Sequence, residues 1–214
     1  MAFKLDRSIN KTKLSNQSSK SASCPYNDKV FCQFFTRLTD AKKYYPGSLK
    51  LSVQSINTAG EKTSSTWQTD GKDKGAITTY KNDNFSSDTI SIGKDIYIKN
   101  TDRNSWTKED LSVFNAGLNF NIDITNIKQF VLSKTVQKLN GAKVQNMGTE
   151  SCGNQICYRY KISIASLNDS QEFLFFDSMN YKLIKTHSEA KNGYREDSSI
   201  SYDSVNIKVP SPLE

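Results

Sequence analysis

Apolar and polar residues alternate along most of this chain, and two stretches with helical spacing interrupt the alternation. Leu49, Leu51 and Val53 are separated by single polar residues, which is typical of a strand with one buried face. Turn residues such as Gly60, Gly71 and Gly93 divide the chain into further segments of the same kind. We therefore expect strands near residues 49–53, 62–69, 76–81, 89–92, 95–100, 142–150, 156–164, 171–177, 181–187 and 197–209.

The first helical stretch follows Pro25, with Asn27 or Asp28 as its N-cap, and continues to Tyr45. Its apolar positions recur every three or four residues, which predicts an amphipathic helix. These positions are Val30, Phe31, Phe34, Phe35, Leu38 and Ala41.

The second helical stretch lies between the two runs of strands. Residues 107–110 approximate a capping box ahead of Leu111 and Phe114, and this predicts a helix that starts at Thr107. A longer helix is expected next, capped by Asp123 or Thr125 and ending at residues 140–141. Its apolar stripe consists of Ile127, Phe130, Val131, Leu132, Val136 and Leu139.

These elements predict an α+β fold, a strongly curved antiparallel half-barrel of about ten strands with about three helices in or over its concave face. A sheet of that size curls, and the apolar residues on its inner face need a cover. Residues 173–176 are apolar on both sides of a strand, which predicts a central strand packed above and below. Helices laid in an open barrel would leave a slot in which an acyl chain fits.

The net charge of +7 is concentrated at the N-terminal end. Residues 1–50 carry ten Lys or Arg against three Asp, whereas the remaining residues carry 19 charges of each sign. This distribution does not favour a nucleic-acid-binding face, which would gather Arg and aromatic residues on the folded surface. Residues 4–23 are interpreted either as a soluble spacer or as a linker that anionic lipid attracts by about 1 kcal/mol per cation.

We predict a flexible basic tail over residues 1–23, a single domain over residues 24–212, and a cloning scar at residues 213–214. The longest apolar run, residues 173–176, is far shorter than the roughly 18 residues that cross a bilayer. The N-terminus resembles neither a signal peptide nor a lipoprotein signal. We therefore expect a mature fragment whose native signal was removed.

Four cysteines form two close pairs in the sequence, Cys24 with Cys32 and Cys152 with Cys157. We favour two local disulfides, and hence an oxidising compartment, although four cysteines allow three pairings. The intervening Gly153 and Asn154 indicate a hairpin turn that would bring the second pair together across two strands. Reduced, buried thiols in a cytosolic protein are the alternative.

Nothing in the sequence builds a common catalytic or metal site, and we predict a non-enzymatic protein without a cofactor. The single histidine, His187, lies 30 residues from the nearest cysteine, and neither cysteine spacing is typical of a metal site. An exposed or edge-strand His187 is the simpler interpretation than a catalytic one. No Gly-rich phosphate loop or calcium loop is present.

Several segments resemble the LolA-like and LppX/LprG-like superfamily of bacterial lipoproteins. The resemblance starts with a helix followed by residues 48–54, and it covers most of residues 25–210. It continues through residues 67–72, 91–99, 105–108, 155–161, 175–183 and 205–210. The resemblance implies an unclosed barrel lidded by helices, an extracytoplasmic and membrane-anchored native form, and a lipid or a lipidated protein as partner. We expect a monomer.

The implied cavity would be lined by apolar residues of the helices and strands. The candidates are Phe34, Phe35, Leu38, Leu51, Val53, Trp67, Ile92, Ile96, Ile127, Phe130 and Val131. Trp67, Tyr97 and Trp106 are candidates for the mouth of the pocket. The alternative hypothesis is a surface adaptor with a filled core that binds protein partners.

Overall fold

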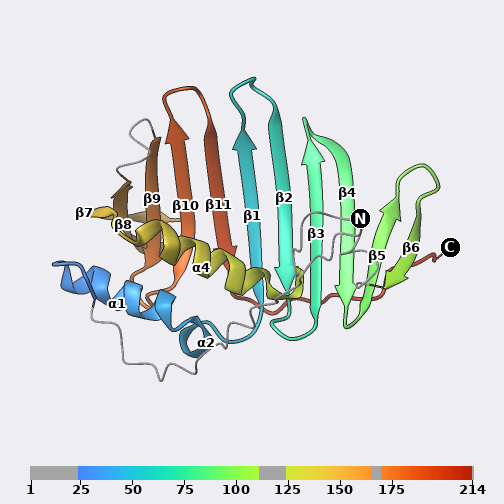
Figure 1. Ribbon diagram of the computed structural model, residues 1–214, viewed down its shortest axis with the longest axis horizontal. Helices are drawn as coiled ribbons and strands as arrows, with labels where there is room; N and C mark the ends of the chain where they lie inside the picture. Colours follow the sequence, from blue (N-terminus) through green and yellow to red (C-terminus); the bar gives the residue numbers. More distant parts are fainter. Residues whose placement is uncertain (1–23, 111–123, 165–169, 214) are drawn as a thin grey trace, which may run out of the picture.

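The computed structural model describes residues 24–110, 124–164 and 170–213. They form an eleven-stranded antiparallel sheet, open at two edges, with helices on one face (Figure 1). The predicted fold class is confirmed, with eleven strands in place of about ten. The strands are β1 (Leu49–Ile56), β2 (Lys62–Thr69), β3 (Lys74–Lys81), β4 (Asn84–Ile92), β5 (Asp95–Asn100), β6 (Ser105–Asp110), β7 (Lys143–Cys152), β8 (Gln155–Ser163), β9 (Ser170–Asp177), β10 (Leu183–Ala190) and β11 (Arg195–Ser201).

The sheet consists of two meanders, in the order β6-β5-β4-β3-β2-β1-β11-β10-β9-β8-β7. They join where β1 pairs with β11, with Leu51 opposite Ile200. The strands on either side of the helical insertion, β6 and β7, are therefore the two edges of the sheet. Because the insertion connects these edges, its chain must cross the sheet, and α4 (Ile127–Leu139) lies across the face that we term concave (Figure 1).

The first helix, α1 (Lys29–Thr39), begins where the sequence predicts. Oδ1 of Asp28 accepts hydrogen bonds from the backbone N–H groups of Val30 and Phe31, both at 2.9 Å. Such a cap satisfies two of the four N–H groups that a helix start leaves without partners. The short α2 (Ala41–Tyr44) follows and leads into β1.

The longer helix, α4, is preceded by a 3-10 turn, η1 (Ile124–Asn126). Asn126 occupies the N-cap position and its side chain makes no capping hydrogen bond. The predicted cap at Thr125 is therefore wrong, and Asp123 lies outside the described residues. η1 lies close to the sheet at Gly75, where an added Cβ would stand 2.6 Å from Cγ2 and from the backbone O of Ile124. The missing side chain of Gly75 is therefore what lets the crossing segment approach β3.

The helix predicted to start at Thr107 is wrong. These residues belong to β6, in which Thr107 pairs with Ile98 and Glu109 with Ile96 of β5. A capping box is a local preference, whereas a six-residue ladder satisfies backbone groups along the whole segment. The remaining residues of that predicted helix, Leu111 and Phe114, lie outside the described part of the chain.

The last strand, β11, ends at Ser201, earlier than the predicted Val209. The C-terminal residues continue to the β6 edge, where the backbone N–H of Trp106 donates to the carbonyl of Pro212 at 3.0 Å. This contact covers part of an otherwise unpaired edge strand.

All four apolar residues of β9, Phe173 to Phe176, are buried, as the sequence predicts. Phe173 and Phe175 lie on the face opposite the helices, and long cationic side chains cover them there. The guanidinium of Arg159 lies 4.3 Å from the ring centroid of Phe173, and Nζ of Lys185 lies 4.8 Å from that of Phe175. Cation–π contacts thus take the place of a second packed layer.

Both predicted disulfides are present. Cys24 is bonded to Cys32 with Cα atoms 5.5 Å apart, and Cys152 to Cys157 with Cα atoms 6.0 Å apart. The second bond closes the β7–β8 hairpin, as the turn residues between its cysteines predict.

Candidate functional site

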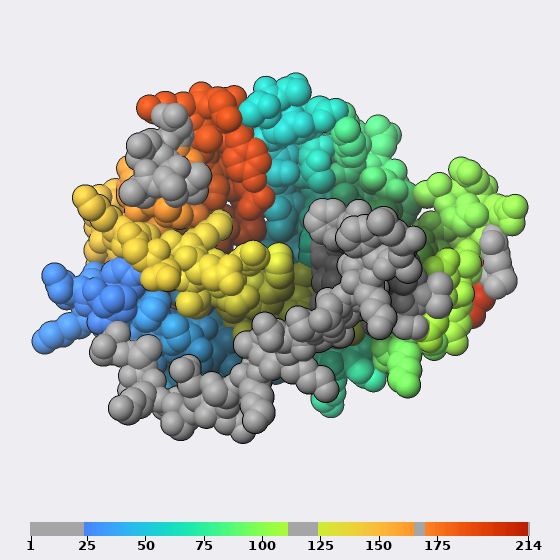
Figure 2. Space-filling model, in the orientation of Figure 1, coloured from blue at the N-terminus to red at the C-terminus, as the bar shows by residue number. Residues whose placement is uncertain are grey.

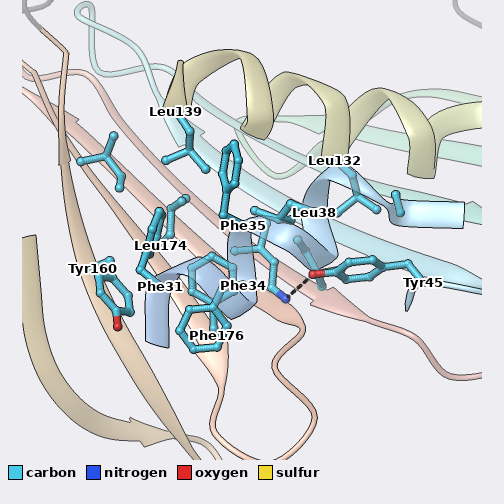
Figure 3. Packing of buried hydrophobic residues seen from close by; sticks show 14 of the residues in the cluster. Phe31, Phe34, Phe35, Leu38, Tyr45, Leu132, Leu139, Tyr160, Leu174 and Phe176 are labelled. Carbon is cyan, nitrogen blue, oxygen red and sulfur yellow. Dashed lines mark hydrogen bonds between the residues drawn. The ribbon is translucent and has the colours of Figure 1, made fainter. Parts of the chain in front are cut away.

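The first helix fills the concave face over β8 to β10. The ring of Phe34 stacks on Phe176 with centroids 4.2 Å apart and planes within 7°, and Phe31 packs against Tyr160 at 4.8 Å. These side chains gather beneath α1, together with Tyr45, whose hydroxyl accepts from the backbone N–H of Leu183 (Figure 3). This half of the concave face is a packed protein core.

Only one side of α4 is buried. Leu132 and Leu139 point toward α1 and the sheet (Figure 3). Nζ of Lys128 donates to the carbonyl of Gly47 at 2.6 Å and ties the start of α4 to the chain that leads into β1. Burial lowers the pKa of Lys128, and the positive charge of Lys182 lowers it further.

A strip of half-buried apolar side chains remains beside α4. Val53 of β1, Trp67 of β2 and Val131 of α4 pack against the core but keep part of their surface exposed, and we term these three residues the α4 strip. Trp67 pairs with the buried Leu51, so the strand residues of the strip lie on the concave face. Nε1 of Trp67 donates to Oγ of Ser65 at 2.9 Å, which leaves the indole ring itself as an apolar surface. In Figure 2 the surface is hollowed beside α4, where β11 and β1 lie behind the helix.

Polar groups lie on the same face, toward β9 and the start of β11. Nζ of Lys138 lies 2.9 Å from Oε1 of Glu172, and the Tyr194 hydroxyl donates to Glu196 at 2.8 Å. Burial, followed by the hydrogen bond to the Glu196 carboxylate, raises the pKa of Tyr194 to about 12. An amphipathic molecule could therefore meet apolar contacts at the strip and hydrogen-bonding groups further along the same face. These polar residues lie on α4, on β9, in the β10–β11 turn and on β11, and no sequence motif brings them together.

The eleven predicted cavity residues divide into three groups. Five are buried in the core cluster: Phe34, Phe35, Leu38, Leu51 and Ile127. Three form the α4 strip. The other three are scattered: Ile96 is buried on β5, Ile92 lies on the opposite face of the sheet, and Phe130 on α4 is 47% exposed.

Of the predicted mouth residues, only Trp67 lies on the concave face. Trp106 pairs with Lys99 on the opposite face and is buried there, with Nζ of Lys99 6.0 Å from its ring centroid. Tyr97 is buried on that same face. Both act as structural anchors at that end of the sheet.

His187 is neither exposed nor on an edge strand, so that prediction is wrong. It lies on the interior strand β10 with 17% of its side chain exposed, Nδ1 lies 2.7 Å from Oδ1 of Asp197, and Nε2 lies 3.5 Å from Glu189. Burial acts to raise the pKa of Asp197, but hydrogen bonds from His187 and Arg195 outweigh it and lower the pKa. Both ring nitrogens thus face carboxylates, and within the described residues no hydroxyl or thiol hydrogen-bonds to the ring.

Two surface cavities lined by described residues are polar. One of about 380 Å³ lies at the ends of β1, β2 and β11 and includes Lys62, Asp83 and Arg195. The other, of about 500 Å³, lies between Lys50 and the start of the C-terminal segment. Both are lined mainly by polar and charged residues, and neither includes a residue of the α4 strip. Over residues 24–110, 124–164 and 170–213, no cluster of His, Cys, Asp or Glu is placed to hold a metal ion, and no helix is long and apolar enough to cross a membrane.

Among solved structures, the chain is similar to the lipoprotein LppX of Mycobacterium tuberculosis. The alignment covers 82% of this chain and 97% of the LppX chain, with 14% sequence identity and a TM-score of 0.52. This chain has the same fold as LppX. The resemblance drawn from the sequence is confirmed at the level of the fold. No family model and no curated protein sequence matches the chain.

Two weaker similarities were also found. One is to the LolA superfamily protein NE2245 of Nitrosomonas europaea, with 10% identity over 82% of this chain and 92% of that one, and a TM-score of 0.30. The other is to the MucA/MucB complex of Pseudomonas aeruginosa, with 9% identity over 78% of this chain and 54% of that one, and a TM-score of 0.43.

Proposed function

We propose that this chain is a non-enzymatic, extracytoplasmic domain that holds a hydrophobic ligand, namely a lipid, an acyl chain or a lipidated partner, along the α4 strip. The observation that carries the proposal is the half-buried position of Val53, Trp67 and Val131 on a face that the helices cover incompletely. Removing apolar surface from water stabilises a complex by about 25 cal/mol per Å². An acyl chain laid beside α4 would bury such surface without disturbing the core under α1.

The disulfides support the extracytoplasmic assignment, because both cysteine pairs are oxidised and such bonds persist in oxidising compartments. The fold shared with the lipoprotein LppX supports a native form that is anchored to a membrane. We further propose that the domain acts as a monomer.

The two tryptophans provide an internal test, because they lie on opposite faces of the sheet. In a Trp106→Phe variant, Trp67 is the only tryptophan, and a brominated fatty acid is expected to quench its fluorescence in a saturable manner. In the matched Trp67→Phe variant, Trp106 is expected to stay unquenched. Equal quenching of both variants, or of neither, would overturn binding at the strip.

Charge substitutions on α4 give a second test. Val131→Lys places a cation in the strip, whereas Gln129→Lys adds the same charge on the exposed side of the helix. We expect the first variant to bind the brominated fatty acid at least about tenfold more weakly, because the ammonium group would have to be desolvated beside an apolar chain. The second variant is expected to bind as the unmodified protein does.

A protein adaptor is the second candidate function, and the packed core under α1 favours it. There the stacked rings of Phe34 and Phe176 leave no slot between helix and sheet. Native mass spectrometry of protein purified from cells separates the two candidates. Extra mass from retained lipid supports the ligand-holding domain, whereas a clean mass together with unquenched Trp67 supports the adaptor.

A further inference from the structure

Two turns at one end of the sheet expose apolar side chains next to each other. The β9–β10 turn carries Met179, which is 85% exposed, and the β7–β8 hairpin leads into Ile156, which is 58% exposed. Among the large hydrophobic side chains of the described residues these two are the most exposed. The backbone N–H of Ser178 donates to the carbonyl of Ile156 at 3.0 Å, so the two turns are in direct contact.

Both turns are held in shape by their own contacts. The buried Asp177 accepts from the backbone N–H of Met179 at 2.8 Å and from Nδ2 of Asn180 at 2.5 Å. The disulfide between Cys152 and Cys157 closes the other turn. The exposed side chains are therefore presented on a rigid support, and a partner would not have to order them first.

Cations and aromatic rings border the β9–β10 turn. The guanidinium of Arg37 lies 5.0 Å from the ring centroid of Tyr181 and 5.2 Å from that of Tyr44, and it donates to the carbonyl of Asn180. Nζ of Lys43 lies 4.9 Å from the ring centroid of Tyr44. We term this end of the molecule, with Ile156, Met179, Arg37, Lys43, Tyr44 and Tyr181, the basal surface. α1 and α2 border it (Figure 1).

The segment that contains α1 and α2 is rich in cations. Within residues 24–50, which contain α1 and α2, five Lys or Arg stand against two Asp, whereas residues 51–214 carry equal numbers of cations and anions. Lys182, in the β9–β10 turn, adds a further cation 4.8 Å from the ring centroid of Tyr202. The segment that borders the basal surface thus carries a net positive charge.

We propose that the basal surface docks on an anionic membrane, with Met179 and Ile156 entering the headgroup region while the surrounding cations contact lipid phosphates. Exposed apolar side chains beside Arg, Lys and Tyr suit a membrane interface, where aromatic rings and snorkelling cations are both stable. An acidic protein partner is less well matched, because the two apolar tips protrude and do not line a recess. The inference does not depend on a ligand at the α4 strip.

Vesicle co-sedimentation of the full chain tests the proposal, with phosphatidylcholine vesicles that contain or lack phosphatidylglycerol. We expect binding to the anionic vesicles that weakens at high salt, and little binding to the neutral ones. An Ile156→Glu/Met179→Glu variant is expected to lose about tenfold or more in partitioning, because two buried apolar contacts become charges near anionic lipid. A Lys42→Glu/Lys43→Glu variant, which reverses both exposed lysines of α2, is expected to lose a comparable amount.

Matched controls lie at the opposite end of the sheet. Tyr80→Glu changes a side chain that is 40% exposed near the β3–β4 turn, and Lys62→Glu reverses an exposed charge at the start of β2. Both controls are expected to partition as the unmodified chain does.

If the Ile156/Met179 variant, with an unchanged circular dichroism spectrum, binds as tightly as the unmodified chain, residues 1–23 alone account for binding and the docking surface is refuted. Absence of binding to anionic vesicles refutes it as well and leaves an acidic protein as the partner to test. Neither result affects the Trp67 quenching that tests ligand binding.

Discussion

Replacing Phe34 by Ala tests whether α1 is part of the core or a lid that opens. Phe34 is fully buried, stacks on Phe176 and makes further ring contacts with Phe31, Tyr158 and Tyr181. Removing a buried Phe ring costs about 3–5 kcal/mol, and its aromatic contacts account for about 0.5–1.5 kcal/mol each. Since domains are stable by only about 5–15 kcal/mol, this variant should lose a large part of its free energy of unfolding.

Urea unfolding followed by tryptophan fluorescence and by far-UV circular dichroism measures the loss. We expect the midpoint to fall with little change in slope, because the surface exposed on unfolding stays nearly constant. Phe130→Ala is the matched control, since the same ring is 47% exposed on α4 and its removal should cost about 0.5 kcal/mol. A loss below about 1 kcal/mol for Phe34→Ala would show that α1 is a loosely held lid and would refute the packed core.

Three further predictions concern stability. Asp28→Ala should destabilise the protein by about 1 kcal/mol, because it removes the α1 cap. Burial acts to raise the pKa of Asp28, but hydrogen bonds outweigh this effect and lower the pKa. The bond from the backbone N–H of Phe31 is the largest of these contributions. The contribution of the cap to stability should therefore be complete above the ordinary carboxyl pKa and vanish as the pH falls through the lowered one, so that the two proteins converge in acid melts. Gly75→Ala should lower the free energy of unfolding by about 1–3 kcal/mol, since the added Cβ would collide with Ile124. Thermal unfolding measures this loss, and an unchanged melting temperature would contradict the close approach of η1 to β3. A Cys24→Ser/Cys32→Ser variant should lose about 2–3 kcal/mol in urea titrations through loss of the loop constraint, and a smaller change would mean that α1 packing alone holds this segment.

Local patterns in the sequence were sufficient for most of the elements. The alternation of Leu49, Leu51 and Val53 predicted β1, and a cap at Asn27 or Asp28 predicted the start of α1, which Asp28 caps. The Gly–Asn turn predicted the hairpin that Cys152 and Cys157 close. These features depend on residues only a few positions apart, so neighbouring residues alone determine them.

Tertiary structure decided the rest. Thr107 belongs to a strand because β5 supplies a ladder, against a local helix signal. Ile92 and Ile96 lie on opposite faces because the turn between them sets the register, and a one-residue difference in register reverses every side chain. The α4 strip and the basal surface each join residues from elements far apart in the chain. Their positions depend on the pairing of β1 with β11 and on the crossing of α4, contacts of long sequence separation that no local pattern encodes.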